Sequence, residues 1–438
     1  MLSSTVSRHL GEEAKALAMR LRQVRPLAMV MPMVPAAGLN ATALDSIDRY
    51  LAEGRAGLRT LVDGYLDWLT GPRGYAAGDA EAQRRFTVIR LRFQQVLTQF
   101  DIFADAVTQR SEHGYGIWLG GLDHLARDAL SIPGVIDRPP PLLTYLDRGI
   151  GAAIRRARTR LPGGGDNPVA IIRVPRERMI GAAVGSSLVH EVGHQAAALL
   201  DLVPSLRRAI AAARADAPDE ALAWDYWQRT ISEIVADLWS VARLGVGSTV
   251  GLIGVVSIPR PFVFRMRLDD PHPFPWIRVR ISAAIGGALF PDRQWSALAD
   301  MWERLYPPQG LSGRKRRVLH ALDDHVPQLV ALMLGHRAPA LRGRTLGEAL
   351  AVGDRQPERL RRLYAKWRRG EVATVARQPT LAVAMAAQAR ADGTLGAAEE
   401  GRLVRALLGS WALDRNLPRA AARAPPPSPL LPRLTHAA

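Results

Sequence analysis

The sequence predicts a mostly α-helical protein of the α+β class. Apolar residues recur at helical spacing over 43–69 and 80–113, so we expect two long helices near the start of the chain. The segment NPVAIIRVP at 167–175 is short, β-branched and bounded by turn residues, which is typical of a strand. From about residue 311 the chain is again helical and rich in arginine. We therefore expect helical N- and C-terminal regions around a central part that contains a small β-sheet.

Changes in composition divide the chain into four expected regions. The proline-rich segment SIPGVIDRPPPLL at 131–143 marks the end of a helical N-terminal domain of residues 1–130. A central domain of residues 131–310 follows, and then a helical, arginine-rich region of residues 311–417. The Pro- and Ala-rich tail of residues 418–438 is expected to be disordered, because its composition cannot form a packed core.

Two further segments of the central domain have recognisable patterns. Residues 144–165 are expected to form a basic helix that ends at LPGGGD. The most apolar stretch, LGVGSTVGLIGVVSI at 244–258, contains four glycines and is too short to cross a membrane. We interpret it as a buried loop or strand and expect no membrane span. The first apolar run near the N-terminus is broken by Pro32 and Pro35, so we expect a cytoplasmic protein, with secretion as the alternative.

The overall composition is that of a globular protein. The chain has 438 residues, of which 48% are hydrophobic and 23% are charged, enough for two or three domains with sizeable cores. There is no cysteine, which excludes disulfides and cysteine-based metal sites. Any metal ion must therefore be held by histidine and carboxylate side chains.

The formal net charge of +17 raises the question of a polyanionic partner. Almost all of the positive charge is arginine, since the lysines are Lys15, Lys315 and Lys366 alone. No recognised nucleic-acid-binding motif accompanies this charge, so we expect no nucleic-acid partner.

The stretch GSSLVHEVGHQAAALLDL at 185–202 carries the clearest chemical pattern. His190 and His194 are four residues apart, which places both imidazoles on one face of a helix. Glu191 lies beside them. Two imidazoles and a nearby carboxylate are what a catalytic zinc site draws from its first helix, although so short a pattern can also arise by chance.

A third metal ligand is expected from the helix predicted at 218–245. This helix is apolar except for one stripe, formed by Tyr226, Thr230, Glu233, Asp237 and Ser240. Burying carboxylates is costly unless they are paired or bound to a metal. Glu233 is therefore the expected third zinc ligand, and Asp237 is expected to accept the second N–H of a ligating histidine. The alternative is that both carboxylates pair with arginines.

The segment LDDPHPFPWIRVRISAAIGGALF at 268–290 begins with a proline-rich loop that contains His272 and offers further polar groups. It leads into a helix expected to begin near Pro275, and it could bring His272, Arg278 or Arg280 to the site. The alternative interpretation is an ordinary helix start.

Together, HEVGH, EIVAD and PHPFPWIRV resemble the motifs of gluzincin metallopeptidases, and most closely those of the prenyl-protein (CAAX) and related quality-control endopeptidases. The resemblance implies a zincin-like catalytic domain within residues 131–310, in which an edge strand, here 167–175, runs along the substrate cleft. It also implies one zinc ion on His190, His194 and Glu233, with Glu191 as catalytic base and Asp237 in support. His272 and Arg278 match the loop of the family.

The expected function is therefore a zinc endopeptidase that cleaves a protein or peptide substrate. Glu191 would act as general base, and the oxyanion donor would be His272, Tyr226 or Arg278. One alternative is a helical scaffold with a structural zinc site and protein partners on its helical flanks. Another is a binder of nucleic acid or an anionic surface through the arginine-rich C-terminal helices.

Overall fold

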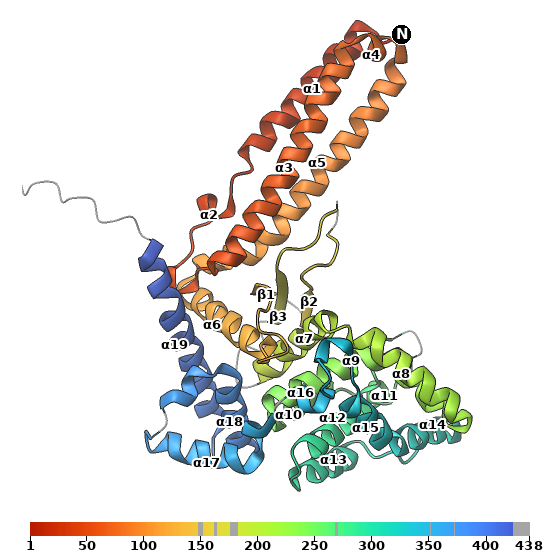
Figure 1. Cartoon of the computed structure of the whole chain (residues 1–438), viewed down its shortest axis with the longest axis vertical. Coiled ribbons are helices and arrows are strands. Elements are labelled where there is room, and N and C mark those ends of the chain that lie inside the picture. Colours follow the sequence, from red (N-terminus) through yellow and green to blue (C-terminus); the bar gives the residue numbers. More distant parts are fainter. Residues whose placement is uncertain are drawn as a thin grey trace, which may run out of the picture. The chain divides into compact units, whose positions relative to one another are not determined.

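The chain forms two compact units, each mostly helical. The computed structural model describes residues 1–147, 152–161, 164–175, 183–267, 270–350, 352–371 and 373–423. The first unit consists of Met1–Gly121 and the C-terminal segment from Leu408, and the second of Leu122–Leu161 and Gly165–Leu407. The elements are labelled in Figure 1. A mostly α-helical α+β class with one small sheet is confirmed, whereas the expected division into four regions stays a prediction.

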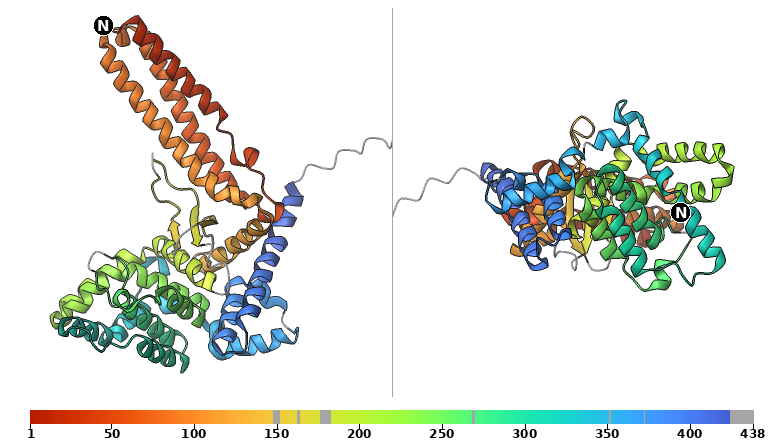
Figure 2. Two further views of the ribbon diagram at one scale, coloured as in Figure 1. Left: turned by 180° about the vertical axis from the view of Figure 1, so that it is seen from behind. Right: turned by 90° about the horizontal axis from the view of Figure 1, so that it is seen from below.

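The first unit is built on three long helices, α1 (Ser4–Gln23), α3 (Ala41–Thr70) and α5 (Asp79–Thr108). They lie side by side in Figures 1 and 2, and their apolar stripes form one buried core. The long helices expected from the periodicity at 43–69 and 80–113 are therefore confirmed, the second ending earlier than expected. The shorter elements are α2 (Leu27–Val30), η1 (Pro35–Ala37), α4 (Pro72–Ala77), η2 (Gln109–Ser111) and α6 (His113–Leu130).

The second unit contains a three-stranded mixed sheet in the order β1-β3-β2. β1 (Leu142–Asp147) runs parallel to β3 (Ala170–Pro175), and β2 (Ala153–Arg155) runs antiparallel to it. The strand expected within 167–175 is confirmed as β3. However, β3 is the central strand and not an edge strand, so the expectation that it borders the cleft is wrong; the described edge strand nearer α7 is β2.

The expectation of a basic helix at 144–165 is also wrong, because β1 and β2 occupy part of this segment. In β1 the side chains of Leu142, Leu143 and Leu146 are buried. Thr144 donates its backbone N–H and its hydroxyl to Asp123 Oδ1, both at 2.8 Å. These partners lie far away in the sequence, so the local arginine spacing gave no sign of the strand.

Helix α9 (Ala221–Leu244) is the centre of the second unit and packs against α7 (Ala183–Leu199), α8 (Leu202–Asp216) and α12 (Pro275–Leu289). Together with η4 (Pro218–Glu220) it confirms the helix predicted at 218–245. The remaining elements are α11 (Arg260–Val263), α13 (Gln294–Leu305), α14 (Gly313–Asp324), α15 (Val326–Gly335), η5 (Pro339–Leu341), α16 (Leu346–Leu350), η6 (Val352–Arg355), α17 (Pro357–Arg368), η7 (Ala373–Arg377), α18 (Pro379–Ala391) and α19 (Ala397–Arg423).

The apolar stretch 244–258 is a helix, α10 (Val246–Val256), and the expectation of a loop or strand there is wrong. Gly245, at φ 57°, ends α9 and allows α10 to start at once. Gly247 then permits close packing, since an added Cβ would lie 2.5 Å from Ala387 Cβ on α18. The glycines that argued against a helix thus serve packing and a chain reversal.

Two further expectations concerned membrane-spanning helices and the C-terminal tail. Among the helices in the described part of the chain, none is both long and apolar enough to cross a membrane. Helix α19 continues through Pro418 to Arg423, and the rest of the tail expected to be disordered lies outside the described residues.

The contact between α7 and α9 is unusually close at Gly193. A Cβ atom added there would lie 2.8 Å from Ala236 Cα and 3.0 Å from Trp239 Cβ. Only glycine lets the two backbones approach this far, so the second variable residue of HEVGH, Gly193, has a structural role.

We predict that Gly193→Ala destabilises the second unit by about 1–3 kcal/mol, because the added methyl group overpacks the contact between α7 and α9. The matched control is Gly254→Ala in α10, where an added Cβ meets no described atom within 4 Å. This control should be neutral or stabilising by up to about 1 kcal/mol, since alanine favours a helix. Urea unfolding of both variants measures the difference, and equal stabilities would contradict the packing argument.

Candidate metal centre

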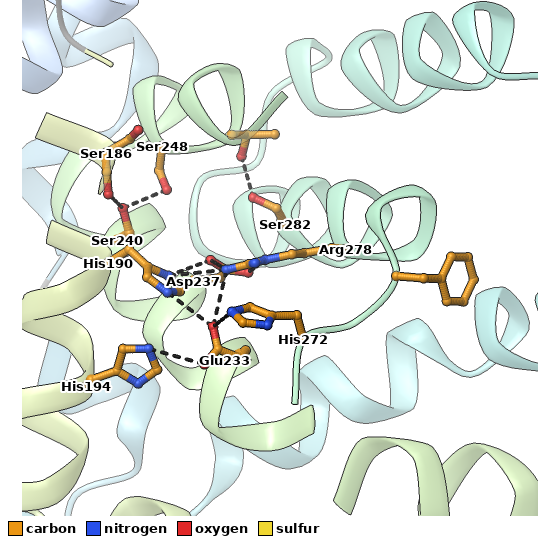
Figure 3. Close-up of polar contacts among 12 residues, drawn as sticks. Ser186, His190, His194, Glu233, Asp237, Ser240, Ser248, His272, Arg278 and Ser282 are labelled. Atoms are coloured by element: carbon orange, nitrogen blue, oxygen red, sulfur yellow. Dashed lines mark hydrogen bonds and ion pairs between the residues drawn. The ribbon is translucent and has the colours of Figure 1, made fainter. Parts of the chain in front are cut away.

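Helices α7 and α9 bring two imidazoles and one carboxylate together. His190 and His194 lie one turn apart on α7, and Glu233 faces them from α9 (Figure 3). His190 Nε2 is 3.3 Å from Glu233 Oε2, and His194 Nε2 is 3.4 Å from Glu233 Oε1. The potential ligand atoms of the three residues all lie within 4.8 Å of one another, so this group could hold a metal ion.

Glu233 is a buried carboxylate with room for a further positive partner. Its Oε2 atom lies 3.3 Å from His190 Nε2, 3.2 Å from His272 Nε2 and 3.6 Å from Arg278 Nη2, but forms no hydrogen bond of good geometry among the described residues. Burial raises the pKa of this carboxyl, but the adjacent His190 and His194 outweigh burial and hold the pKa far below its usual range. A buried, charged oxygen without a hydrogen bond is costly, and a bound cation would remove that cost.

Asp237 supports His190 from behind. Its Oδ1 atom lies 2.8 Å from His190 Nδ1, which leaves Nε2 of the ring directed toward Glu233. Such a contact fixes the tautomer of a ligating imidazole and makes it a better donor. Burial lowers the pKa of His190, but the charge of Asp237, the hydrogen bond to Asp237 and the nearby carboxylate of Glu233 outweigh this and raise it to about 9.

Arg278, on α12, is bound to Asp237 and does not face the pocket as a free group. Its Nε atom lies 2.7 Å from Asp237 Oδ2, and Nη2 lies 2.9 Å from Oδ1, a bidentate ion pair. Burial raises the pKa of Asp237, but Arg278 and His190 outweigh it, and the pKa is lowered to about 2. The sequence left open whether Asp237 supports a histidine or pairs with an arginine. In the structure Asp237 contacts both His190 and Arg278.

Glu191 lies in the pocket beside the three potential ligands. The carboxyl is largely buried, and burial raises its pKa against the opposing effect of His190 and His194. The pocket, of about 150 Å³, is lined by α7, α9, α10 and the loop before α12. A buried carboxylate of raised basicity next to a potential metal site is suited to accept a proton.

One wall of this pocket is formed by α10 and was not predicted from the sequence. Ser248 of α10 donates to Ser240 Oγ at 2.8 Å, and Ser240 donates to the carbonyl oxygen of Ser186 at 3.3 Å (Figure 3). Leu252 and Val255 of α10 line the same pocket. Only the placement of Ser240 on the polar stripe of α9 pointed to this wall, because α10 was not recognised as a helix.

His272 reaches the site from the loop before α12. Its Nε2 atom lies 3.2 Å from Glu233 Oε2, and its Nδ1 atom lies 2.8 Å from Asp270 Oδ1. The imidazole is half-exposed. Arg280, the other cation that the sequence offered here, instead binds Asp323 through Nε and Nη2, both at 2.9 Å.

Tyr226 holds this loop in place. Its hydroxyl oxygen accepts the backbone N–H of Phe274 at 2.9 Å, two residues after His272. Burial raises the pKa of Tyr226 to about 12, so the hydroxyl stays neutral. The structure therefore brings together the predicted ligands, Glu191, Asp237 and His272, and gives Tyr226 and Arg278 bonds that position other residues.

Comparisons of this chain with protein-family models, with curated proteins and with solved structures found no match. Any functional assignment therefore rests on the geometry of the site.

We predict that metal binding tightens as the pH rises toward 9. A metal ion needs a neutral imidazole, and below its pKa of about 9 His190 holds a proton that the ion must displace. Loss of this proton contributes up to about a tenfold gain in apparent affinity per pH unit between about pH 7 and 9. Competition with a chelator of known affinity, repeated across this pH range, measures the slope.

Asp237→Asn tests the cause of this pH dependence. Without the aspartate charge the pKa of His190 falls, so the slope should become shallower, and affinity should drop by about 10–100-fold. Asp392→Asn is the matched control, because Asp392 also accepts two hydrogen bonds from one arginine, Arg361, at 3.0 and 3.2 Å. A slope that is the same in Asp237→Asn and in the unchanged protein would contradict the assignment to His190.

Proposed function

We propose that the protein is a zinc-dependent endopeptidase. The observation that carries the proposal is the convergence of His190, His194 and Glu233 next to the buried carboxyl of Glu191, which lines a pocket together with His190. Two imidazoles and one carboxylate, without sulfur, form a ligand set typical of catalytic zinc sites, which keep one coordination position for water or substrate. When bound, zinc supplies Lewis acidity, which makes water more acidic and polarises a carbonyl group.

In this proposal Glu191 is the general base. It takes a proton from the attacking water and delivers it to the nitrogen of the leaving amine as the peptide bond breaks. Burial favours this role, because a carboxylate with a raised pKa is a stronger base than one in water. A site with a purely structural ion has no use for a carboxyl at this position.

The remaining residues hold and complete the site. Asp237 orients the His190 ring, and Arg278 compensates the charge of Asp237. His272 is the preferred oxyanion donor, because its bond to Asp270 leaves Nε2 directed toward the ligand group. Tyr226 and Arg278 are less suitable donors, since each is bonded to another group of the protein.

We predict about one zinc ion per chain in protein purified without a histidine tag, and its loss in both His194→Ala and Glu233→Ala. Each variant removes one of three protein ligands and leaves too few donors for tight binding. Plasma mass spectrometry of the purified proteins gives the metal content. Retention of zinc by Glu233→Ala would assign the third ligand to another residue, with Asp237 the next to test.

We predict that Glu191→Gln keeps its zinc and loses peptide hydrolysis by about 10²–10⁴-fold, because the amide cannot accept the proton of water. Cleavage of dye-labelled casein and of a mixed peptide library measures activity. Glu303→Gln is the control, since Glu303 lies on α13 outside the pocket and contacts Arg280 at 3.8 Å. Cleavage by Glu191→Gln at the rate of the unchanged protein would exclude the mechanism. Zinc without any hydrolysis in the unchanged protein would favour a scaffold with a structural site.

A further inference from the structure

The end of α10, the link that follows it and α11 expose apolar side chains, one of which lines the pocket. Val255, Ile258 and Phe262 are 36%, 38% and 50% exposed, and Val255 also lines the pocket. We call these three residues the apolar edge. Large apolar side chains gathered on one short segment are unusual on a surface that meets only water.

The apolar edge is held outward by specific contacts. Tyr306 donates its hydroxyl to the carbonyl oxygen of Ile258 at 3.1 Å, and Arg260 donates to the carbonyl oxygen of Pro307 at 3.0 Å. Arg260 also lies 5.1 Å from the ring of Phe264, a buried residue of this segment. The exposure of Ile258 and Phe262 is therefore a property of the folded unit.

The sequence that contains the apolar edge is rich in arginine and is followed by Asp269 and Asp270. The sequence from Leu238 to Leu268 contains no acidic residue, whereas it contains four arginines. Arg265 follows Phe262 by three residues and is exposed, and no ion pair between Arg265 and a carboxylate is found among the described residues. The whole chain carries a net charge of +17. This combination favours a partner that is both apolar and anionic.

The backbone of the segment argues against an extended peptide as that partner. Ser257 and Ile258 donate their N–H groups to Ile253 and Val256, and Pro259 and Pro261 have no N–H to offer. A peptide added here would find few groups to satisfy its own backbone. A lipid surface needs no backbone hydrogen bonds from the protein. Its acyl chains contact apolar side chains, and its anionic headgroups attract arginine.

We propose that the apolar edge and Arg265 form a docking site for anionic lipid bilayers. The apolar edge enters the interface between headgroups and acyl chains, and Arg265 contacts lipid phosphates. Helix α10, with 11 residues, is too short to span a bilayer, so the segment lies at its surface. Because Val255 belongs to both features, docking brings the mouth of the pocket to the membrane surface.

The test is co-sedimentation of the full chain with phosphatidylcholine vesicles that contain or lack phosphatidylserine. We expect binding to the anionic vesicles, weakened by salt. Ile258→Ser combined with Phe262→Ser should reduce the partition coefficient at least about tenfold, because two apolar side chains no longer enter the interface. Arg265→Glu should reduce it by about tenfold through loss of the local attraction.

Two controls separate the docking site from general charge and apolarity. Arg59→Glu changes the net charge by the same amount on an exposed position of α3, and Val88→Ser with Leu91→Ser removes two exposed apolar side chains of α5. Both should bind like the unchanged protein. Equal losses in Arg59→Glu and Arg265→Glu would overturn the proposal in favour of net charge alone. Absence of vesicle binding, with loss of casein cleavage in Ile258→Ser/Phe262→Ser, would overturn it in favour of a polypeptide partner.

Discussion

The close packing of α7 on α9 is the constraint on which the candidate site depends. At Gly193 the two helices approach until an added Cβ would overlap Ala236. This distance brings Glu233 within 3.4 Å of both imidazoles, although the three residues come from different helices. A larger residue at position 193 would push α7 and α9 apart and so increase the distance between the two histidines and Glu233. The geometry of the metal centre therefore depends on this glycine.

The site also depends on a balance of buried charges. Glu233 and Asp237 are one turn apart on a helix that is largely buried, and two anions so placed would destabilise the fold if left alone. His190 contacts both carboxylates, and Arg278 forms a bidentate pair with Asp237. Asp237 is thereby compensated by the protein itself. Glu233 Oε2 lies 3.6 Å from Arg278 Nη2 but keeps no hydrogen bond among the described residues, and a cation bound there would complete the balance.

Helix α10 connects the site to the surface of the second unit. Its first half is buried and contributes Ser248 to the pocket, and its second half carries Val255 to the mouth. The same short helix thus gives the pocket an inner polar wall and an outer apolar edge. Helix α10 therefore contributes both polar and apolar side chains to the lining of the pocket.

The sequence by itself determined the helices that carry the potential ligands, α7 and α9, and the residues most able to bind a metal. The spacing of His190 and His194 and the polar stripe of α9 are local patterns, and helical geometry converts local spacing into a shared face. Only the tertiary structure decided which group each polar residue meets. In the tertiary structure Arg278 pairs with Asp237, and Tyr226 bonds to the loop that carries His272. Strand β3 is the central strand, and the glycine-rich stretch forms α10. These outcomes depend on partners far apart in the sequence, and no local periodicity records a contact between distant segments.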